Sequence, residues 1–352
     1  MRIHIALATM VLAASASPGL AATLAAPTIT RWNIGGPGGW DYLTLDAASH
    51  RLFVTRSDRV MVLATADGSV VGTIPDTAGV HGVAFDRGNG KGFTSNGRGN
   101  SVTRFDLATL RVESVFPVSG QNPDAIVFDD ASHEVWTFNG RSHDATALDP
   151  ASGRIVATIP LGGKPEFAVS DGRGRIFVND EDHATLLVID AKRHALQATW
   201  KLDGCESPSG LAFDAAHRRL FSVCANKEMA VTDSGDGHHV ASVPIGRGPD
   251  AVAYDAESRR IYSSNGADGT LTVIREQDAD RFEAEATIPT QKSARTLALD
   301  SGGHRVYLAA AAFEPAPAAS AGHPAQRPPM TPDSFAILAV PIGPAAPAKH
   351  TH

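Results

Sequence analysis

Seven polar positions recur along the chain, each five residues before an aspartate that closes an apolar segment. They are Asp41, His81, Asp124, Glu166, Ser209, Asp250 and Arg295. Carboxylates are hard oxygen donors that suit Ca²⁺ or Mg²⁺, and a histidine among them widens the choice to transition metals. If the fold brings these positions together, they form a site for a metal ion or a polar ligand.

Within this set, we expect Asp124, Glu166 and Asp250 to bind a divalent cation such as Ca²⁺, and Asp41, His81 and Arg295 to bind a ligand. A second set follows the next strand of each repeat: Arg56, Asn96, Asn139, Asn179, Asn226 and Asn265. Of these, Arg56, Asn96, Asn139 and Asn265 are predicted ligand-binding residues. The alternative is a polar funnel that binds only water, with Asn present because it tolerates turn conformations.

The elements that position these residues form a sevenfold repeat. Its marker aspartates are Asp46, Asp86, Asp129, Asp171, Asp214, Asp255 and Asp300, spaced 40, 43, 42, 43, 41 and 45 residues apart. Each precedes a short polar turn, where an Asp side chain can accept hydrogen bonds from backbone N–H groups. We therefore assign these aspartates a structural role.

Each repeat contains four short segments with strand patterns. A first apolar segment ends in Asp, a second resembles Arg175-Ile-Phe-Val178, a third resembles 185–190, and a fourth resembles 155–159. Four strands repeated at this period predict a blade of a β-propeller. The sequence thus predicts an all-β, seven-bladed propeller over residues 28–343, with blades starting near 40, 80, 122, 164, 207, 248 and 293.

Closure of the ring follows from the two ends of the repeat array. The last copy has a third strand at 334–340 but no fourth, whereas residues 28–36 resemble a fourth strand. We expect residues 28–36 to complete the last blade, which protects both open sheet edges. A closed ring needs no partner strand, so we expect a monomer.

The ends of the second strands carry a family resemblance. Phe53-Val-Thr-Arg56, Phe93-Thr-Ser-Asn96 and Tyr262-Ser-Ser-Asn265 resemble the YVTN repeat of YncE-like bacterial β-propellers. The resemblance implies a propeller from an exported protein. It leaves function open, because one scaffold carries many roles.

Export is also predicted by the N-terminus. Arg2, an apolar segment from Ile5 to Ala16 and the small residues around 18–22 predict a cleavable signal peptide at 1–22 and a periplasmic or secreted protein. No segment is long and apolar enough to predict a membrane span. Two cysteines, Cys205 and Cys224, are expected to form a disulfide in an oxidising compartment.

Two further segments depart from the repeat. Residues 313–333 form a long Pro- and Ala-rich insertion in the last blade, which we expect either to cover the funnel or to be disordered. The tail at 344–352 is expected to be disordered. The net charge of -7, with no basic block, argues against a nucleic-acid partner.

The sequence therefore favours an exported binding or scaffold protein that presents a polar funnel to a small molecule, a metal ion or a periplasmic protein. No nucleophile elbow, HExxH, P-loop or dinucleotide motif is present. Two alternatives stay open. One is a metal-assisted, lactonase-like hydrolase or a lyase, with His81 as proton carrier and Arg56 or Arg295 holding an anionic substrate. The other is a structural envelope protein.

Overall fold

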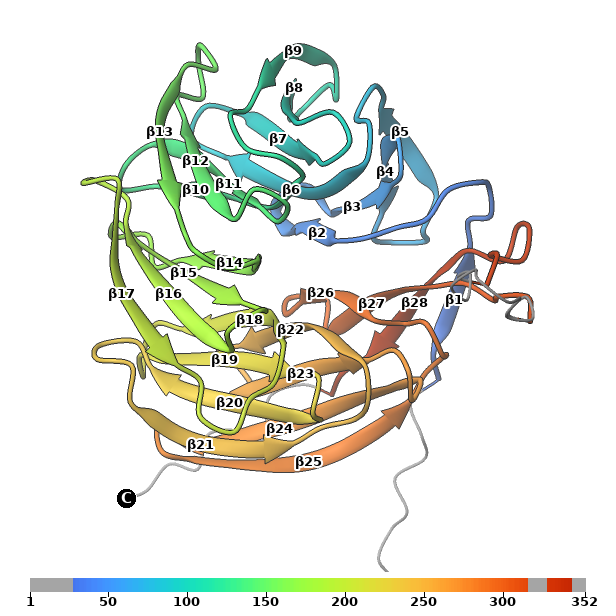
Figure 1. Ribbon diagram of the computed structural model, residues 1–352. Coiled ribbons are helices and arrows are strands. Elements are labelled where there is room, and N and C mark those ends of the chain that lie inside the picture. Colours follow the sequence, from blue (N-terminus) through green and yellow to red (C-terminus); the bar gives the residue numbers. More distant parts are fainter. Residues whose placement is uncertain (1–27, 316–327, 344–352) are drawn as a thin grey trace, which may run out of the picture.

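The computed structural model describes residues 28–315 and 328–343, which form seven four-stranded antiparallel sheets arranged as a ring (Figure 1). The predicted seven-bladed propeller is confirmed. Residues 1–27, 316–327 and 344–352 lie outside the described residues. The signal peptide, most of the 313–333 insertion and the tail therefore stay predictions.

In each blade the first strand is innermost and the fourth outermost. Blade 1 contains β2 (Leu43–Asp46), the 3-10 helix η1 (Ala47–Ser49), β3 (Arg51–Arg56), β4 (Arg59–Ala64) and β5 (Val70–Ile74). Blade 2 contains β6 (Val80–Asp86), β7 (Lys91–Asn96), β8 (Ser101–Asp106) and β9 (Val112–Pro117). Blade 3 contains β10 (Pro123–Asp129), β11 (Glu134–Asn139), β12 (Asp144–Leu148) and β13 (Ile155–Pro160). Blade 4 contains β14 (Pro165–Ser170), β15 (Arg175–Asp180), β16 (Thr185–Asp190) and β17 (Ala195–Lys201).

The remaining blades follow the same order. Blade 5 contains β18 (Pro208–Asp214), β19 (Arg219–Cys224), β20 (Glu228–Asp233) and β21 (His239–Pro244). Blade 6 contains β22 (Pro249–Asp255), β23 (Arg260–Asn265), β24 (Thr270–Asp278) and β25 (Arg281–Pro289). Blade 7 contains β26 (Thr296–Asp300), β27 (Arg305–Ala310), β28 (Ala336–Pro341) and β1 (Thr30–Asn33). No helix of the described residues is long and apolar enough to cross a membrane.

The marker aspartates hold the turns after the innermost strands. Asp86 accepts a hydrogen bond from the backbone N–H of Asn89 at 3.1 Å, and Asp300 accepts one from Gly303 at 2.8 Å. Asp129, Asp171, Asp214 and Asp255 accept equivalent backbone bonds. The predicted structural role of the aspartates agrees with these contacts.

The hydrophobic core lies between adjacent blades. An aromatic ring on the second strand of one blade packs against the residue before the marker aspartate of the next blade. Phe53 and Phe85 have ring centroids 5.0 Å apart, and Phe221 and Tyr254 have centroids 5.4 Å apart. Each blade therefore buries its face only by stacking on its neighbours, as expected for a repeat fold.

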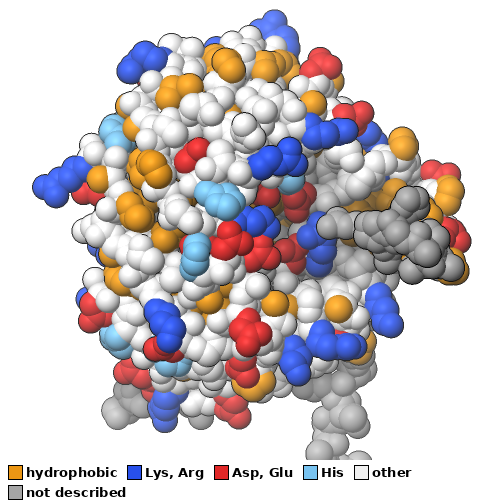
Figure 2. All heavy atoms as spheres, viewed as in Figure 1, with side chains coloured by type: hydrophobic (Ala, Val, Ile, Leu, Met, Phe, Trp, Pro, Cys, Tyr) orange, Lys and Arg blue, Asp and Glu red, His pale blue; other side chains and the backbone are white. Residues whose placement is uncertain are grey.

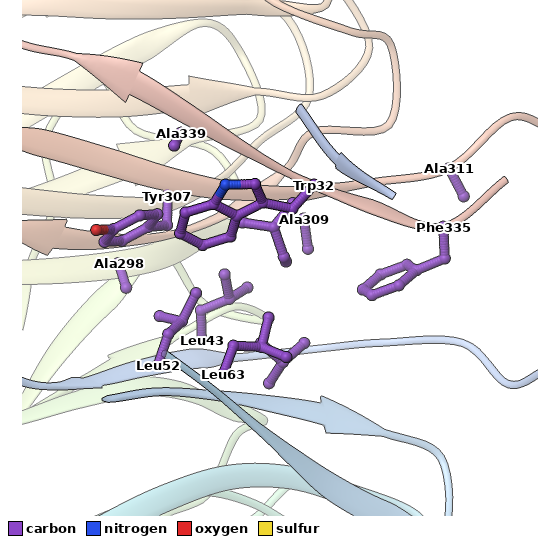
Figure 3. Packing of buried hydrophobic residues seen from close by; sticks show 12 residues of the cluster. Trp32, Leu43, Leu52, Leu63, Ala298, Tyr307, Ala309, Ala311, Phe335 and Ala339 are labelled. Atoms are coloured by element: carbon purple, nitrogen blue, oxygen red, sulfur yellow. The ribbon is translucent and has the colours of Figure 1, made fainter. Parts of the chain in front are cut away.

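The ring is closed by β1, which pairs antiparallel with β28 as the outer strand of blade 7. Trp32 of β1 packs on Tyr307 with ring centroids 5.3 Å apart, beside Leu43, Leu52 and Leu63 of blade 1 (Figure 3). The prediction that residues 28–36 complete the last blade is confirmed.

Candidate functional site

The starts of the innermost strands meet at one mouth of the ring, where they line a cavity of about 430 Å³. We call this cavity and its rim the funnel. Its charged residues include Asp41, His81, Asp124, Lys164, Glu166, Glu181, Asp250 and Arg295. Figure 2 shows acidic and basic side chains gathered at the centre of the ring, where the surface is hollowed.

His81 lies between two carboxylates of the funnel. Its Nδ1 is 2.6 Å from Oδ2 of Asp41 and 3.6 Å from Oδ1 of Asp124. Burial lowers the pKa of His81, but the hydrogen bond with Asp41 and the charge of Asp124 outweigh it and raise this pKa to about 9. The imidazole is therefore protonated at neutral pH.

The other two cationic side chains are also shared between carboxylates. Arg295 hydrogen-bonds to Asp250 and lies 3.8 Å from Asp41. Lys164 Nζ is 2.6 Å from Glu166 and also hydrogen-bonds to Glu181. Among these residues five carboxylates share three cationic partners, so full ionisation would leave an excess negative charge.

This excess charge changes the protonation of the carboxyl groups. Burial, together with neighbouring carboxylates, raises the pKa of Asp124 to about 6 and that of Asp250 to about 6. Burial and the charge of Asp124 raise the pKa of Glu166 to about 8. The charged forms of these groups are disfavoured until a further positive charge enters.

An aromatic pair lies under the charged groups. Tyr42 and Phe167 have ring centroids 4.3 Å apart, and both line the cavity. The Tyr42 hydroxyl is buried and has no hydrogen-bond partner among the described residues. Burial, followed by the surrounding carboxylates, raises its pKa well above the usual value.

Taking the residue five before each marker aspartate predicted only part of this site. It predicted Asp41, His81, Asp124, Glu166, Ser209, Asp250 and Arg295 at the mouth, and the structure brings them there. It missed Tyr42, Lys164, Phe167 and Glu181. Tyr42 and Phe167 directly follow funnel residues in the sequence, so extending the rule by one position would have found both.

The predicted asparagines lie elsewhere. Asn96 is buried, and its amide donates to Ser101 Oγ at 3.1 Å and to Thr103 Oγ1 at 2.9 Å. Asn139 and Asn265 make the same kind of bonds to the third strand of their blades. These three side chains connect strands inside a blade and do not line the funnel, which corrects the expected position.

Two more asparagines of the set donate to backbone oxygens instead. Asn179 donates to Ser209 O at 3.0 Å and Gly210 O at 3.1 Å, which connects blade 4 to blade 5. Asn226 donates to Gly204 O at 2.8 Å. Asn179 therefore positions the start of β18, and Asn226 positions the loop before it.

Arg56 likewise lies outside the funnel. Its side chain is fully buried, and its guanidinium donates to the backbone oxygens of Gly35, Gly36, Pro37 and Gly38 at 2.9–3.1 Å. The guanidinium also lies 3.7 Å from the ring centroid of Phe335. Burial lowers the pKa of Arg56 to about 10. The residue anchors the segment after β1.

The predicted metal ligands do not form one group. Three clusters of His, Asp or Glu in the described ranges have ligand atoms within 4.8 Å of one another, and none contains Asp124, Glu166 and Asp250 together. Asp124 instead joins Asp41 and His81. Glu166 and Asp250 are drawn toward Lys164 and Arg295, because an ion pair is available to each.

Two other predictions concern the same face. Cys205 and Cys224 form the predicted disulfide, with Cα atoms 5.4 Å apart. The described base of the 313–333 insertion holds a bridge between Phe313 and Met330, and the Phe313 ring centroid is 6.1 Å from that of Trp40. Whether the insertion covers the funnel depends on residues 316–327, outside the described residues.

Comparisons with known proteins concern the fold. No protein-family model and no curated protein matches the chain. A chain of the mitotic checkpoint complex crystal structure matches with a TM-score of 0.73 and 13% identity, covering 97% of this chain and 100% of that chain. The structure of U3-55K gives 0.72 at 11% identity, covering 89% and 98%. The RRP9 WD40 repeats give 0.73 at 12% identity, covering 90% and 99%. At these identities the likeness shows a WD40-like propeller fold alone, and membership of the YVTN-repeat family stays a prediction.

Proposed function

We propose that this protein is an exported binding scaffold whose funnel binds a small molecule carrying an ammonium group. The observation that carries the proposal is the charge imbalance of the funnel. Five carboxylates face three cationic side chains around a cavity of about 430 Å³. A cavity of this size suits a small ligand.

The aromatic pair supports an organic cation. Tyr42 and Phe167 lie beside the carboxylates, and an ammonium group over an aromatic ring gains about 0.5–2 kcal/mol. An ammonium ligand would also supply hydrogen-bond donors to the carboxylates and to the free Tyr42 oxygen. A bare metal ion would use neither aromatic ring.

The carboxyl groups give the binding a defined pH dependence. Asp124, with a pKa of about 6, and Glu166, with a pKa of about 8, lose protons as the pH rises, and a cation binds best to the deprotonated forms. Affinity for an amine is therefore expected to increase from pH 5.5 to pH 8.5, as long as the amine stays protonated. An affinity for the amine that falls over this pH range would contradict the proposal.

The test is isothermal titration with diamines, choline and free lysine, with neutral and carboxylate analogues as ligand controls. Asp124→Asn should weaken binding at least about tenfold, the effect of losing one charge-assisted hydrogen bond. Glu134→Gln is a matched protein control, because Glu134 also pairs with a histidine, His194, but lies outside the funnel. Equal binding of cationic and neutral analogues would refute the proposal.

A second candidate rests on a different observation, the approach of Asp41, His81 and Asp124 to within 4.8 Å. These residues could hold a transition metal, in keeping with a metal-assisted hydrolase in which Arg295 binds an anionic substrate. Turnover of lactones or esters that requires added metal, and that disappears in His81→Asn, would support this candidate over the amine site.

Export is part of the proposal. The disulfide between Cys205 and Cys224 suits an oxidising compartment, and residues 1–22 carry the pattern of a signal peptide. Mass spectrometry of the protein from its native host should find a mature N-terminus near residue 22. If no small cation binds, protein partners at the blade rims become the better candidate, since one structural neighbour belongs to a multiprotein complex.

A further inference from the structure

A second histidine cluster lies between blades 5 and 6, away from the funnel residues. Asp214 ends β18, His217 lies in the turn that follows, and Glu276 lies on β24. Their ligand atoms lie within 4.8 Å of one another. Asp214 and Glu276 are buried, whereas about 35% of the His217 side chain is exposed.

The cluster occurs where two blades depart from the repeat. The residue three after the marker aspartate is Ser49, Asn89, Ser132, Gly174, His217, Ser258 or Gly303, so blade 5 alone has a histidine there. In blade 6, β24 and β25 each have nine residues, and their hairpin reaches blade 5, where Arg219 Nε donates to Ala279 O at 2.7 Å. Glu276 lies on this extended part.

One nitrogen faces two carboxylates. His217 Nδ1 is 2.6 Å from Oδ2 of Asp214 and 3.1 Å from Oε1 of Glu276. Because Nδ1 carries at most one proton, it donates to Asp214, and Oε1 of Glu276 has no hydrogen-bond donor among the described residues. The ionised Glu276 carboxylate lacks a donor at Oε1 whether the imidazole is neutral or protonated. A buried carboxylate oxygen without a donor is costly.

We propose that Asp214, His217 and Glu276 form a zinc site that connects blades 5 and 6. A zinc ion on Nδ1 satisfies both carboxylate oxygens with one ligand each, which one proton cannot do. A tetrahedral Zn²⁺ takes imidazole and carboxylate ligands at about 2.0–2.2 Å, and water can reach the fourth position along the exposed side of His217. Ca²⁺ fits poorly, because it takes 6–8 oxygen ligands.

A hydrogen bond from Tyr254 orients the buried carboxylate of Glu276. Tyr254 donates its hydroxyl proton to Oε2 of Glu276 at 2.5 Å, which leaves Oε1 directed at His217. Metal ligands are usually fixed by such second hydrogen bonds, and loss of the partner weakens metal binding about 10–100-fold. The Tyr254 hydroxyl therefore acts as a positioning group.

The test uses full-length protein carrying His81→Asn and His238→Asn, so that the other two clusters of the described residues, Asp41/His81/Asp124 and Asp233/Asp236/His238, lack their histidines. After treatment with a chelator and titration with Zn²⁺ alone, mass spectrometry should find one zinc per chain. His217→Ser should abolish this binding while preserving the fold, because it introduces the residue that blades 1, 3 and 6 carry at this position. Glu276→Gln should weaken binding at least tenfold.

Two readouts complete the test. Saturating Zn²⁺ should raise the unfolding midpoint of the parent by about 3 °C or more and leave that of His217→Ser unchanged. His194→Gln is the matched control, because His194 faces only Glu134 and its loss should leave the zinc content at one. Zinc content that is the same in the parent and in His217→Ser, or an unchanged midpoint in the parent, would overturn the proposal.

Discussion

Replacement of Arg56 by methionine should open the ring at its closure. The guanidinium contacts four successive backbone oxygens of the segment after β1 and lies on Phe335 in the loop before β28. Methionine keeps most of the side-chain volume, so the substitution removes the charge and the donors without a large cavity. No carboxylate partner is left behind, because the acceptors are carbonyls.

The expected loss follows from these contacts. A hydrogen bond to a charged group contributes about 1.5–3 kcal/mol, and a buried cation–π contact about 2 kcal/mol. Two effects reduce the sum. Gly35, Gly36 and Gly38 are partly exposed, so water can reach their freed oxygens, and the fold no longer has to bury a charge. We expect a net loss of about 3 kcal/mol.

Urea unfolding of Arg56→Met and Arg59→Met measures this effect. Arg59 reaches the same segment, donating to Pro37 O at 3.0 Å, but its side chain is about 25% exposed and it pairs with Asp58. Its replacement should cost less than about 1 kcal/mol. Hydrogen exchange should show faster opening of β1 in the Arg56 variant alone. Equal losses in the two variants, or unchanged exchange at β1, would refute the assigned role.

Three further results are expected. Cys224→Ser should lower the free energy of unfolding by about 3 kcal/mol, because the disulfide to Cys205 closes a loop with a sequence separation of 19. An equal loss in the reduced wild-type protein would confirm that the missing disulfide is the cause. Gly68→Ala should cost about 2 kcal/mol or more and loosen β1, since its Cβ would lie 2.2 Å from Trp32 at a φ of +77°. Glu166→Gln should raise the free energy of unfolding by about 1 kcal/mol at pH 9 and change it little at pH 4. The reason is that a carboxyl with a raised pKa stabilises the fold at low pH and loses that contribution as the pH rises through about 8. A gain at pH 4 instead would contradict the assigned protonation.

The fold was predictable because its signals repeat. Seven marker aspartates and their strand patterns each carry weak evidence, but their common spacing fixes the blade number. The closing strand was also predictable, since a sheet lacking its fourth strand and an unpaired strand pattern at 28–36 complete each other.

The asparagines could not be placed from their position alone. Asn96 ends a strand near the funnel, and the end of a strand does not show which way its amide points. A further signal was available. Thr94 precedes Asn96 by two residues and Thr103 follows it by seven, and both bond to its amide group. The same spacing occurs around Asn139 and Asn265, so hydroxyl partners at these offsets predict a buried amide network.

The charge of the funnel depends on distances that the sequence does not contain. Asp124, Glu166 and Asp250 occupy equivalent positions in their blades, yet each has a different cationic neighbour. Lys164 comes from the same blade as Glu166, whereas Arg295 reaches Asp250 from the adjacent blade. Three equivalent carboxylates are therefore divided among separate ion pairs, and the predicted three-carboxylate metal site does not form.

The funnel cluster around His81 and the cluster around His217 follow one physical rule. In each, a single Nδ1 faces two carboxylates, so one proton cannot satisfy both. His81 and Asp124 are partly exposed, and water or a ligand can complete their contacts. Glu276 is fully buried, so water cannot donate a hydrogen bond to its carboxylate. The funnel can therefore stay open to an exchangeable cation, whereas the zinc proposed between blades 5 and 6 would be a resident ion. A cation bound in the funnel should thus exchange quickly, while zinc at His217, held by two buried carboxylates, should exchange more slowly.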